Sequence, residues 1–172
     1  MSLDVGLLGS WDEDDVAELA AVMVDCVDGG ASVNFLRPMA FEDAVTWWMT
    51  ALVDPHSRTW VARDDDGTIV GCVRLGLPQQ PNGRHRGEVG KMLVHRRARG
   101  RGAARELLAQ LEAWAAEHGR HRLVLDTETG SDAEEVYQQL GWTRVGDVPD
   151  FALTADGELT STTYYTKGLL PR

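Results

Sequence analysis

The sequence predicts a mixed α/β fold, in which a central sheet of about seven strands carries helices on both faces. Hairpin signals and strand–helix–strand units occur in the same chain, and this combination favours a mixed sheet covered by helices. The chain has 172 residues, of which 43% are hydrophobic and 26% are charged. These values are typical of one globular domain, here residues 1–172, and no internal repeat or linker divides it.

The N-terminal third is predicted to form one strand and two helices. Residues 3–9 have the composition of a short strand. Apolar residues recur at helical spacing over 13–27 and again over 41–53, so each helix should bury one face. Gly29-Gly30 ends the first helix and Asp54-Pro55 ends the second, because neither pair favours continued helical geometry.

The remaining chain alternates strands with helices. A hairpin is predicted where Asp64-Asp65-Asp66-Gly67 separates two apolar runs, since this is strong turn chemistry. Strands are expected over 58–63, 68–77, 88–94, 122–127, 142–148 and 161–169, and helices over 103–118 and 132–140. Strands 88–94 and 122–127 flank the helix over 103–118, so they should pair in parallel through a right-handed crossover.

Charge is distributed unevenly along an acidic chain. The net charge of −10 argues against general nucleic-acid binding, which needs a basic surface. Residues 84–105 nevertheless hold eight of the 17 basic residues, with Glu88 as their one acid. This basic stripe favours a polyanionic small ligand, and the alternative is a solvated helix entrance with incidental arginines.

The sequence shows no sign of a membrane protein or a metalloprotein. The start of the chain lacks the features of a signal peptide, and no stretch approaches the ~20 apolar residues of a membrane span. Cys26 and Cys72 fall in helix-like and strand-like runs, so we expect buried free thiols and, by default, a cytoplasmic protein. The histidines and cysteines show no metal-binding spacing.

The sharpest functional signal is the segment in which strand 88–94 leads through a glycine-bearing loop into helix 103–118. Free backbone N–H groups and the helix dipole make such a helix start an anion site. Gly100 and Gly102 lack side chains, so a phosphate can approach the backbone closely. The segment matches neither the P-loop pattern nor the dinucleotide fingerprint. A basic loop without a ligand is the alternative.

This segment resembles the coenzyme-binding motif of the GNAT superfamily of N-acetyltransferases, Arg/Gln-x-x-Gly-x-Gly/Ala. Arg99, Gly102 and Ala104 fill the motif, and an overlapping frame also fits. Tyr137 with Leu-Gly-Trp at 140–142 resembles a second signature of the superfamily. The resemblance implies a mostly antiparallel mixed sheet and acetyl-CoA as co-substrate, with its pyrophosphate at the loop and its pantetheine along strand 88–94. The coenzyme-binding residues that it implies are Met92, Leu93, Val94, Arg97, Arg99, Gly100, Arg101, Gly102, Ala103, Ala104 and Ser131.

A narrower resemblance is to the tabtoxin resistance acetyltransferases, which acetylate the amine of an amino-acid-like toxin. It rests on EVGKMLV, ARGRG, LDTETGSDAEEVYQQLGWTRVGDVPDF and the ending DGELTSTTYYTK. GGASVNFL at 29–36 also has the look of this subgroup, in which the segment helps to wall the acceptor site and implicates Asn34 and Phe35. Gly130 stands where many GNAT members have an asparagine, a departure that the subgroup shares.

Three side chains are candidates for the chemistry of acetyl transfer. Glu88 and Asp126 lie on the strands around the loop, and by resemblance they are bases or amine-binding carboxylates. Alternatively, Glu88 pairs with a nearby arginine and Asp126 caps a loop. Tyr137 is a candidate acid for the leaving thiolate because a phenol stays protonated at neutral pH, and packing on the sheet is its alternative role. Arg37 or an arginine of 84–86 is a candidate for binding a substrate carboxylate.

The resulting prediction is an N-acetyltransferase that acts on the amine of a small molecule, such as an antibiotic-like or amino-acid-like toxin, with no nucleic-acid, membrane or metal partner. A homodimer is compatible with the sequence. Two other functions stay open. One is a coenzyme A-binding regulatory module without catalysis, and the other is an acetyltransferase of peptide or protein N-termini. An acceptor pocket closed by residues 29–36 and 150–160 would favour the small molecule.

Overall fold

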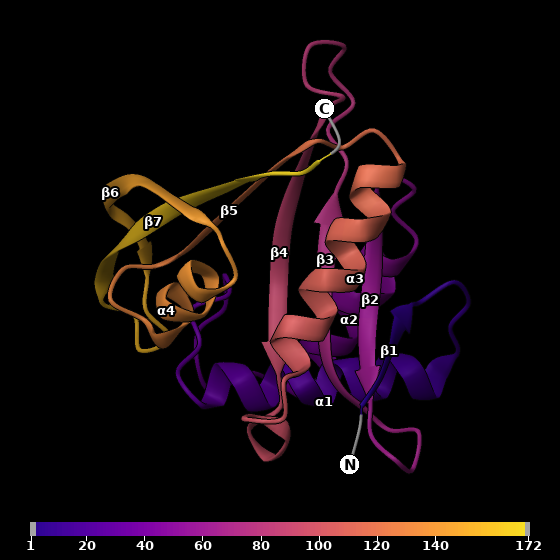
Figure 1. Ribbon diagram of the computed structural model, residues 1–172. Coiled ribbons are helices and arrows are strands. Elements are labelled where there is room, and N and C mark those ends of the chain that lie inside the picture. The colour runs from indigo at the N-terminus through magenta and orange to yellow at the C-terminus, as the bar shows by residue number, and fades with distance from the viewer. Residues whose placement is uncertain (1–2, 171–172) are drawn as a thin grey trace.

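The computed structural model describes residues 3–170, which form one seven-stranded sheet flanked by four helices (Figure 1). The strand order is β1-β2-β3-β4-β5-β7-β6, and the β4–β5 pair alone is parallel. The mixed, mostly antiparallel sheet predicted from the sequence is therefore confirmed. The elements are β1 (Asp4–Leu7), α1 (Glu13–Asp28), α2 (Phe41–Leu52), β2 (Ser57–Arg63), β3 (Ile69–Gly76), β4 (Arg86–Val94), a 3₁₀ turn (Arg96–Ala98), α3 (Ala103–Glu117), β5 (Arg122–Glu128), α4 (Asp132–Gln139), β6 (Thr143–Leu153) and β7 (Leu159–Gly168).

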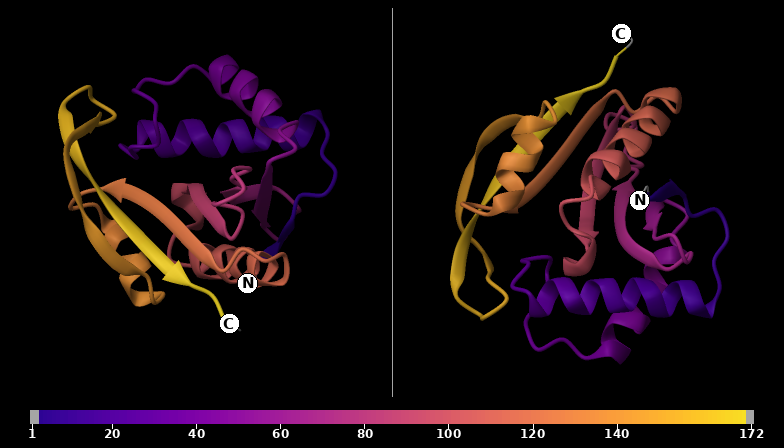
Figure 2. Two further views of the ribbon diagram at one scale, coloured as in Figure 1. Left: turned by 90° about the horizontal axis from the view of Figure 1, so that it is seen from above. Right: turned by 60° about the horizontal axis from the view of Figure 1, so that its bottom comes forward.

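The helices cover both faces of the sheet, and β2 and β3 show how the two faces are divided. Trp60 and Ala62 pack with α3, whereas Val61 between them packs with α1 and α2. This alternation follows from the two-residue repeat of a strand. Figure 2 shows α1 and α2 on one side of the sheet and α3 on the other. None of the helices within residues 3–170 is long and apolar enough to span a bilayer.

β4 and β5 are joined by a short seam and then separate. Their register covers Arg86–Glu88 against Arg122–Val124 and goes no further. Beyond it the two strands diverge toward the end of the sheet where α1 and α4 lie (Figure 1). Gly87 makes the seam tight, because a Cβ on this residue would lie 2.7 Å from Leu75 Cδ1 and 2.9 Å from Leu123 Cδ2. The divergence leaves the β5-facing edge of β4 without a neighbouring strand.

A β-bulge in β4 changes which side chains face α2. Cys72 pairs with Leu93 and Arg74 pairs with Gly90, so two β4 residues stand opposite Val73. One of them, Lys91, has a positive φ of 49°. The bulge breaks the alternation of β4, so Gly90 and Lys91 both lie on the α2 face. A strict two-residue repeat would have placed them on opposite faces.

Two local features differ from the sequence-based prediction. The strand predicted to end at residue 148 continues as β6 to Leu153, because pairing with β7 resumes at Ala152 after an irregularity at Pro149 and Asp150. The loop after β4 contains the unpredicted 3₁₀ turn. Both cysteines are free and buried, as predicted.

Candidate active site

The divergence of β4 and β5 creates a cleft of about 440 Å³. One wall is β4 from Val89 to Val94, and the other is formed by the end of β5 and by α4. Gly29–Val33, after α1, and Arg99 and Ala104, at the start of α3, complete the lining. The cleft therefore brings together the strand, the loop and the helix start that the sequence singled out.

The start of α3 has the geometry of an anion site. Gly102 is its N-cap with φ 82°, and no side chain caps the helix. Gly100 also has a positive φ, of 74°. These left-handed conformations suit glycine and shape the loop that enters the helix. The first amide groups of α3 are consequently free of side-chain acceptors and lie beside the cleft.

The arginines of the basic stripe are not all available to a ligand. Arg96 pairs with Asp25 at 2.9 Å, and Arg101 pairs with Asp64 at 3.0 Å. Arg99 is exposed, and its Nε donates to the carbonyl of Val94 at 3.3 Å. Arg97 and Arg105 are exposed and form no ion pair with any residue from 3 to 170. The stripe thus keeps a positive edge around the α3 start, and the Arg101 side chain is held by the β2–β3 turn.

The predicted coenzyme-binding residues gather around this cleft. Six of the eleven line it: Met92, Leu93, Val94, Arg99, Ala104 and Ser131. The other five lie in the adjoining loop and the first residue of α3. Ala103 is buried against the core, so it would contribute through its backbone.

The two candidate carboxylates share one face of the sheet. Asp126 lines the cleft, and its Oδ2 accepts a hydrogen bond from Thr162 Oγ1 at 2.8 Å. Glu88 lies outside the lining, is 61% exposed and pairs with Arg86 at 3.4 Å. Burial raises the pKa of Tyr164, with added effects of Asp126 and then Glu88, so this tyrosine lies near both carboxylates. Within residues 3–170, no group of three or more His, Cys, Asp or Glu side chains is arranged to hold a metal ion.

Tyr137 lies on α4 and lines the cleft while its ring packs in the core. It is 7% exposed and meets Trp142 edge to face at 6.0 Å. Its hydroxyl forms no hydrogen bond with the residues that the structure describes. Burial, with a smaller effect of Asp126, raises the pKa of Tyr137 to about 12. Tyr137 therefore packs in the core and lines the cleft at the same time.

Two segments far apart in the sequence, residues 32–37 and 153–156, are joined by several contacts. Ser32 Oγ donates to the Leu153 carbonyl at 3.3 Å, and the Arg37 amide donates to the Ala155 carbonyl at 2.9 Å. Arg37 also forms a bidentate ion pair with Asp156, with both distances 2.6 Å. We call these contacts the latch. Because Arg37 is held in the latch, it is not free to bind a substrate carboxylate, contrary to the sequence-based suggestion.

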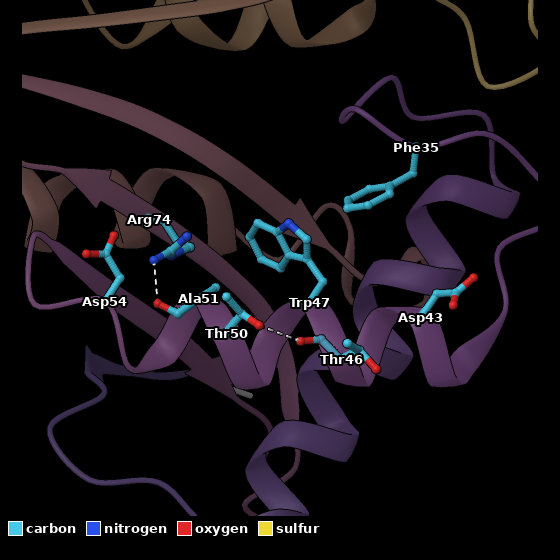
Figure 3. Close-up of a pocket in the computed structure, with 8 residues that line it drawn as sticks. All are labelled: Phe35, Asp43, Thr46, Trp47, Thr50, Ala51, Asp54 and Arg74. Carbon is cyan, nitrogen blue, oxygen red and sulfur yellow. Dashed lines mark hydrogen bonds between the residues drawn. The ribbon is translucent and has the colours of Figure 1, made fainter.

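The two residues predicted to bind substrate differ in position. Asn34 is exposed, with a positive φ of 75°. Phe35 is half-buried and meets Trp47 edge to face at 6.0 Å. Phe35 and Trp47 line a second hollow, of about 560 Å³, against α2 (Figure 3).

Sequence reasoning missed two cations beside this second hollow. Arg74 lines it from β3, and the Lys91 ammonium lies 5.1 Å from the centre of the Trp47 ring. Arg74 is a lone cation within the otherwise apolar β3, and this was the signal in the sequence, whereas Lys91 shares β4 with Arg86 and Glu88. The helix of Trp47, which the spacing did predict, and the bulge at Lys91, which it did not, bring them together.

Comparisons with known proteins agree with this architecture. The model of the acetyltransferase (GNAT) family matches residues 28–142. A GCN5-related N-acetyltransferase from Kribbella flavida is 25% identical, with a TM-score of 0.79 and 98% of each chain covered. Ribosomal-protein-alanine N-acetyltransferase from Brucella melitensis is 24% identical, with a TM-score of 0.77 over 97% of this chain and 100% of that one. A phosphinothricin acetyltransferase from Sinorhizobium meliloti, in complex with AcCoA, is 15% identical, with a TM-score of 0.79 over 98% and 89% of the two chains.

Proposed function

Because the chain belongs to the acetyltransferase (GNAT) family, we propose that it transfers the acetyl group of acetyl-CoA to the amine of a small molecule. We propose an antibiotic-like or amino-acid-like toxin as the acceptor, in keeping with the resemblance to tabtoxin resistance enzymes. The latch is the single observation that carries the small-molecule part, because it ties residues 32–37 to 153–156, the two segments that we propose border the acceptor. A single cytoplasmic domain, able to form a homodimer, remains part of this proposal.

The described residues fit coenzyme A. The uncapped start of α3 and the exposed arginines beside it suit the pyrophosphate. The β5-facing edge of β4, at Met92 to Val94, offers backbone groups that can pair with the amides of pantetheine. In this proposal acetyl-CoA supplies the thioester, and the chain supplies the site that orients it.

The candidate side chains supply the proton transfers that the reaction needs. An ammonium acceptor must first lose a proton, and Asp126 or Glu88 can take it, directly or through water. The free amine then forms a C–N bond with the thioester carbonyl carbon, the C–S bond breaks, and the nitrogen, cationic after the attack, releases a second proton that replaces, directly or through water, the one that Tyr137 gives to the thiolate. Tyr137 can donate its proton to the leaving thiolate, because its raised pKa keeps the hydroxyl protonated and the hydroxyl has no other acceptor within residues 3–170. A backbone N–H of Met92 to Val94 is the proposed partner of the oxyanion.

A peptide or protein N-terminus is the principal competing acceptor, since the two similar acetyltransferases from Brucella melitensis and Sinorhizobium meliloti are named for different acceptors. An extended peptide needs an open groove, which the latch opposes. A coenzyme-binding module without catalysis would leave Asp126 and Tyr137 at the cleft without a chemical role.

Thiol release from acetyl-CoA, measured with matched acceptors, tests the proposal. The panel contains amino acids, simple primary amines, spermidine and short peptides with free N-termini. The expected result is the highest kcat/KM with a compact amine. A peptide or spermidine as the best acceptor would refute the small-molecule assignment, and binding of coenzyme A without turnover on any amine would favour the regulatory module.

A further inference from the structure

We propose that Arg74 and Lys91 form an anion subsite, which binds a carboxylate of the acceptor beside the aromatic rings of Trp47 and Phe35. The inference rests on the proposed function and narrows the acceptor to a small zwitterion, whose amine and carboxylate lie a few bonds apart. Neither residue has another role in the chemistry described above. Figure 3 shows Arg74, Trp47 and Phe35 around the second hollow.

The two cations lack acidic partners. Among the residues that the structure describes, neither forms an ion pair. Arg74 donates through Nη2 to the Ala51 carbonyl at 2.7 Å and to Ser57 Oγ, and its Nε is buried without a partner. Asp54 lies on the rim of the hollow, but its Oδ1 accepts from the His56 amide instead. Both side chains are partly buried, and cations withdrawn from water normally pair with counterions, so a pair without a direct ion pair is unusual for a purely structural cluster.

The cations also lie close enough to repel one another. Burial lowers the pKa of Lys91, and the charge of Arg74 lowers it further. Burial likewise lowers the pKa of Arg74, and the charge of nearby Asp54 partly offsets this. One anion between them would relieve both the repulsion and the loss of hydration.

Aromatic rings hold the cations in place without neutralising them. The Lys91 ammonium lies 5.6 Å from the centre of the Phe35 ring, and the Arg74 guanidinium lies 5.4 Å from that of Trp47. Contacts of this kind leave the net charge intact. The alternative is that these contacts serve folding alone, and the experiment below must separate the two.

The register of β3 and β4 places the subsite beside the candidate bases. Arg74 is directly opposite Gly90, and Gly76 is directly opposite Glu88, so these residues share one face of the sheet. Gly90 has no side chain, and no atom lies within 4 Å of where its Cβ would be. Glu88 and Gly90 are two residues apart on β4, about 7 Å along a strand. Open space therefore lies between the carboxylate and cationic groups, as a zwitterion requires.

Lys91 connects this subsite to the coenzyme cleft. The residue lines the cleft and contacts the aromatic rings of the second hollow. Asp126, on the opposite wall of the cleft, partly offsets the lowering of the Lys91 pKa. An acceptor held at Lys91 thus has its amine on the side of Asp126.

The test compares amino acids with the amines that result from their decarboxylation. We expect wild-type kcat/KM to be about 10- to 100-fold higher for the zwitterion, the effect of one hydrogen bond between charged groups. Lys91→Met and Arg74→Met should each abolish most of this preference through a higher KM for the zwitterion, with the amines and the Kd for coenzyme A little changed. Lys91→Met removes a charge that has no ion-pair partner in the described structure, so it should fold even where Arg74→Met does not.

Arg58→Met is the matched control, because Arg58 lies 5.8 Å from the Trp114 ring on the opposite side of the sheet. It should leave the preference unchanged. Three results would overturn the subsite. In Lys91→Met or Arg74→Met, kcat/KM could fall equally on the zwitterion and the amine, or the Kd for coenzyme A could rise with the preference intact. The third is a wild-type protein that prefers the decarboxylated amines. If no amine is acetylated, the proposed function fails. Thermal shifts then test the subsite separately, since zwitterions should raise the Tm of the wild type and not of Lys91→Met.

Discussion

Replacement of Tyr137 by phenylalanine separates a catalytic role from a packing role. The ring is 7% exposed and contacts Trp142 at 6.0 Å and Tyr165 at 6.1 Å, and phenylalanine keeps these contacts. The hydroxyl has no hydrogen-bond partner among residues 3–170, so its removal leaves no described partner unpaired. We therefore expect the free energy of unfolding to change by less than about 0.5 kcal/mol.

Turnover should respond very differently. Loss of a general acid costs ~10²-fold or more, which corresponds to about 2.7 kcal/mol in the activation barrier. Thiol release under saturating acetyl-CoA gives kcat, calorimetry gives the Kd for coenzyme A, and thermal unfolding gives stability. Wild-type turnover in a folded Tyr137→Phe variant, with chemistry rate-limiting, would refute the catalytic role.

Tyr165→Phe is the matched control within the same cluster. The Tyr165 hydroxyl donates to Glu134 and accepts from Gln138 Nε2 at 3.0 Å, so its loss removes hydrogen bonds, one of them to a charged group. We expect a destabilisation of about 1.5–3 kcal/mol with turnover little changed. If both variants lose stability and turnover in parallel, the reasoning from hydrogen-bond partners is wrong.

Three further predictions concern the coenzyme, the bases and pH. Ala104→Glu should abolish coenzyme A binding in calorimetry by placing a negative charge at the cleft, whereas Ala109→Glu, exposed further along α3, should not. Glu88→Gln and Asp126→Asn should each lower kcat/KM for the amine and spare the Kd for coenzyme A; a raised Kd would move these residues to the coenzyme site. The rate should rise with pH through one ionisation, as the amine or the base loses its proton. Tyr137 should cause no loss of rate below about pH 10, because its pKa is raised to about 12. A fall in rate near neutral pH would contradict the role of Tyr137 as the acid.

The elements and the glycine-bearing start of α3 were predictable because both depend on local sequence. Hydrophobic periodicity located most of the seven strands and four helices, and the glycines at 100 and 102 marked the uncapped start of α3. The start of α1 also follows from its sequence, since Asp12 and Asp15 form a reciprocal cap there. Each of these features needs only a few neighbouring residues.

The acceptor side could not be predicted, because it depends on contacts between distant segments. Arg37 was a candidate for a substrate carboxylate, yet it pairs with Asp156, 119 residues later. Arg101 pairs with Asp64 in the same way. Lys91 faces Trp47 because of a bulge that breaks the alternation of β4, and the residues around it carry no mark of that bulge.

Gly87 lies at the centre of the short seam where β4 and β5 pair directly. The two strands that border the cleft meet there, where Leu75 and Leu123 leave no room for even a methyl group. A Cβ at this position would meet the ends of two leucine side chains that lie outside the cleft lining, so an alanine here should be accommodated largely by movement of those side chains rather than by a change in the width of the cleft.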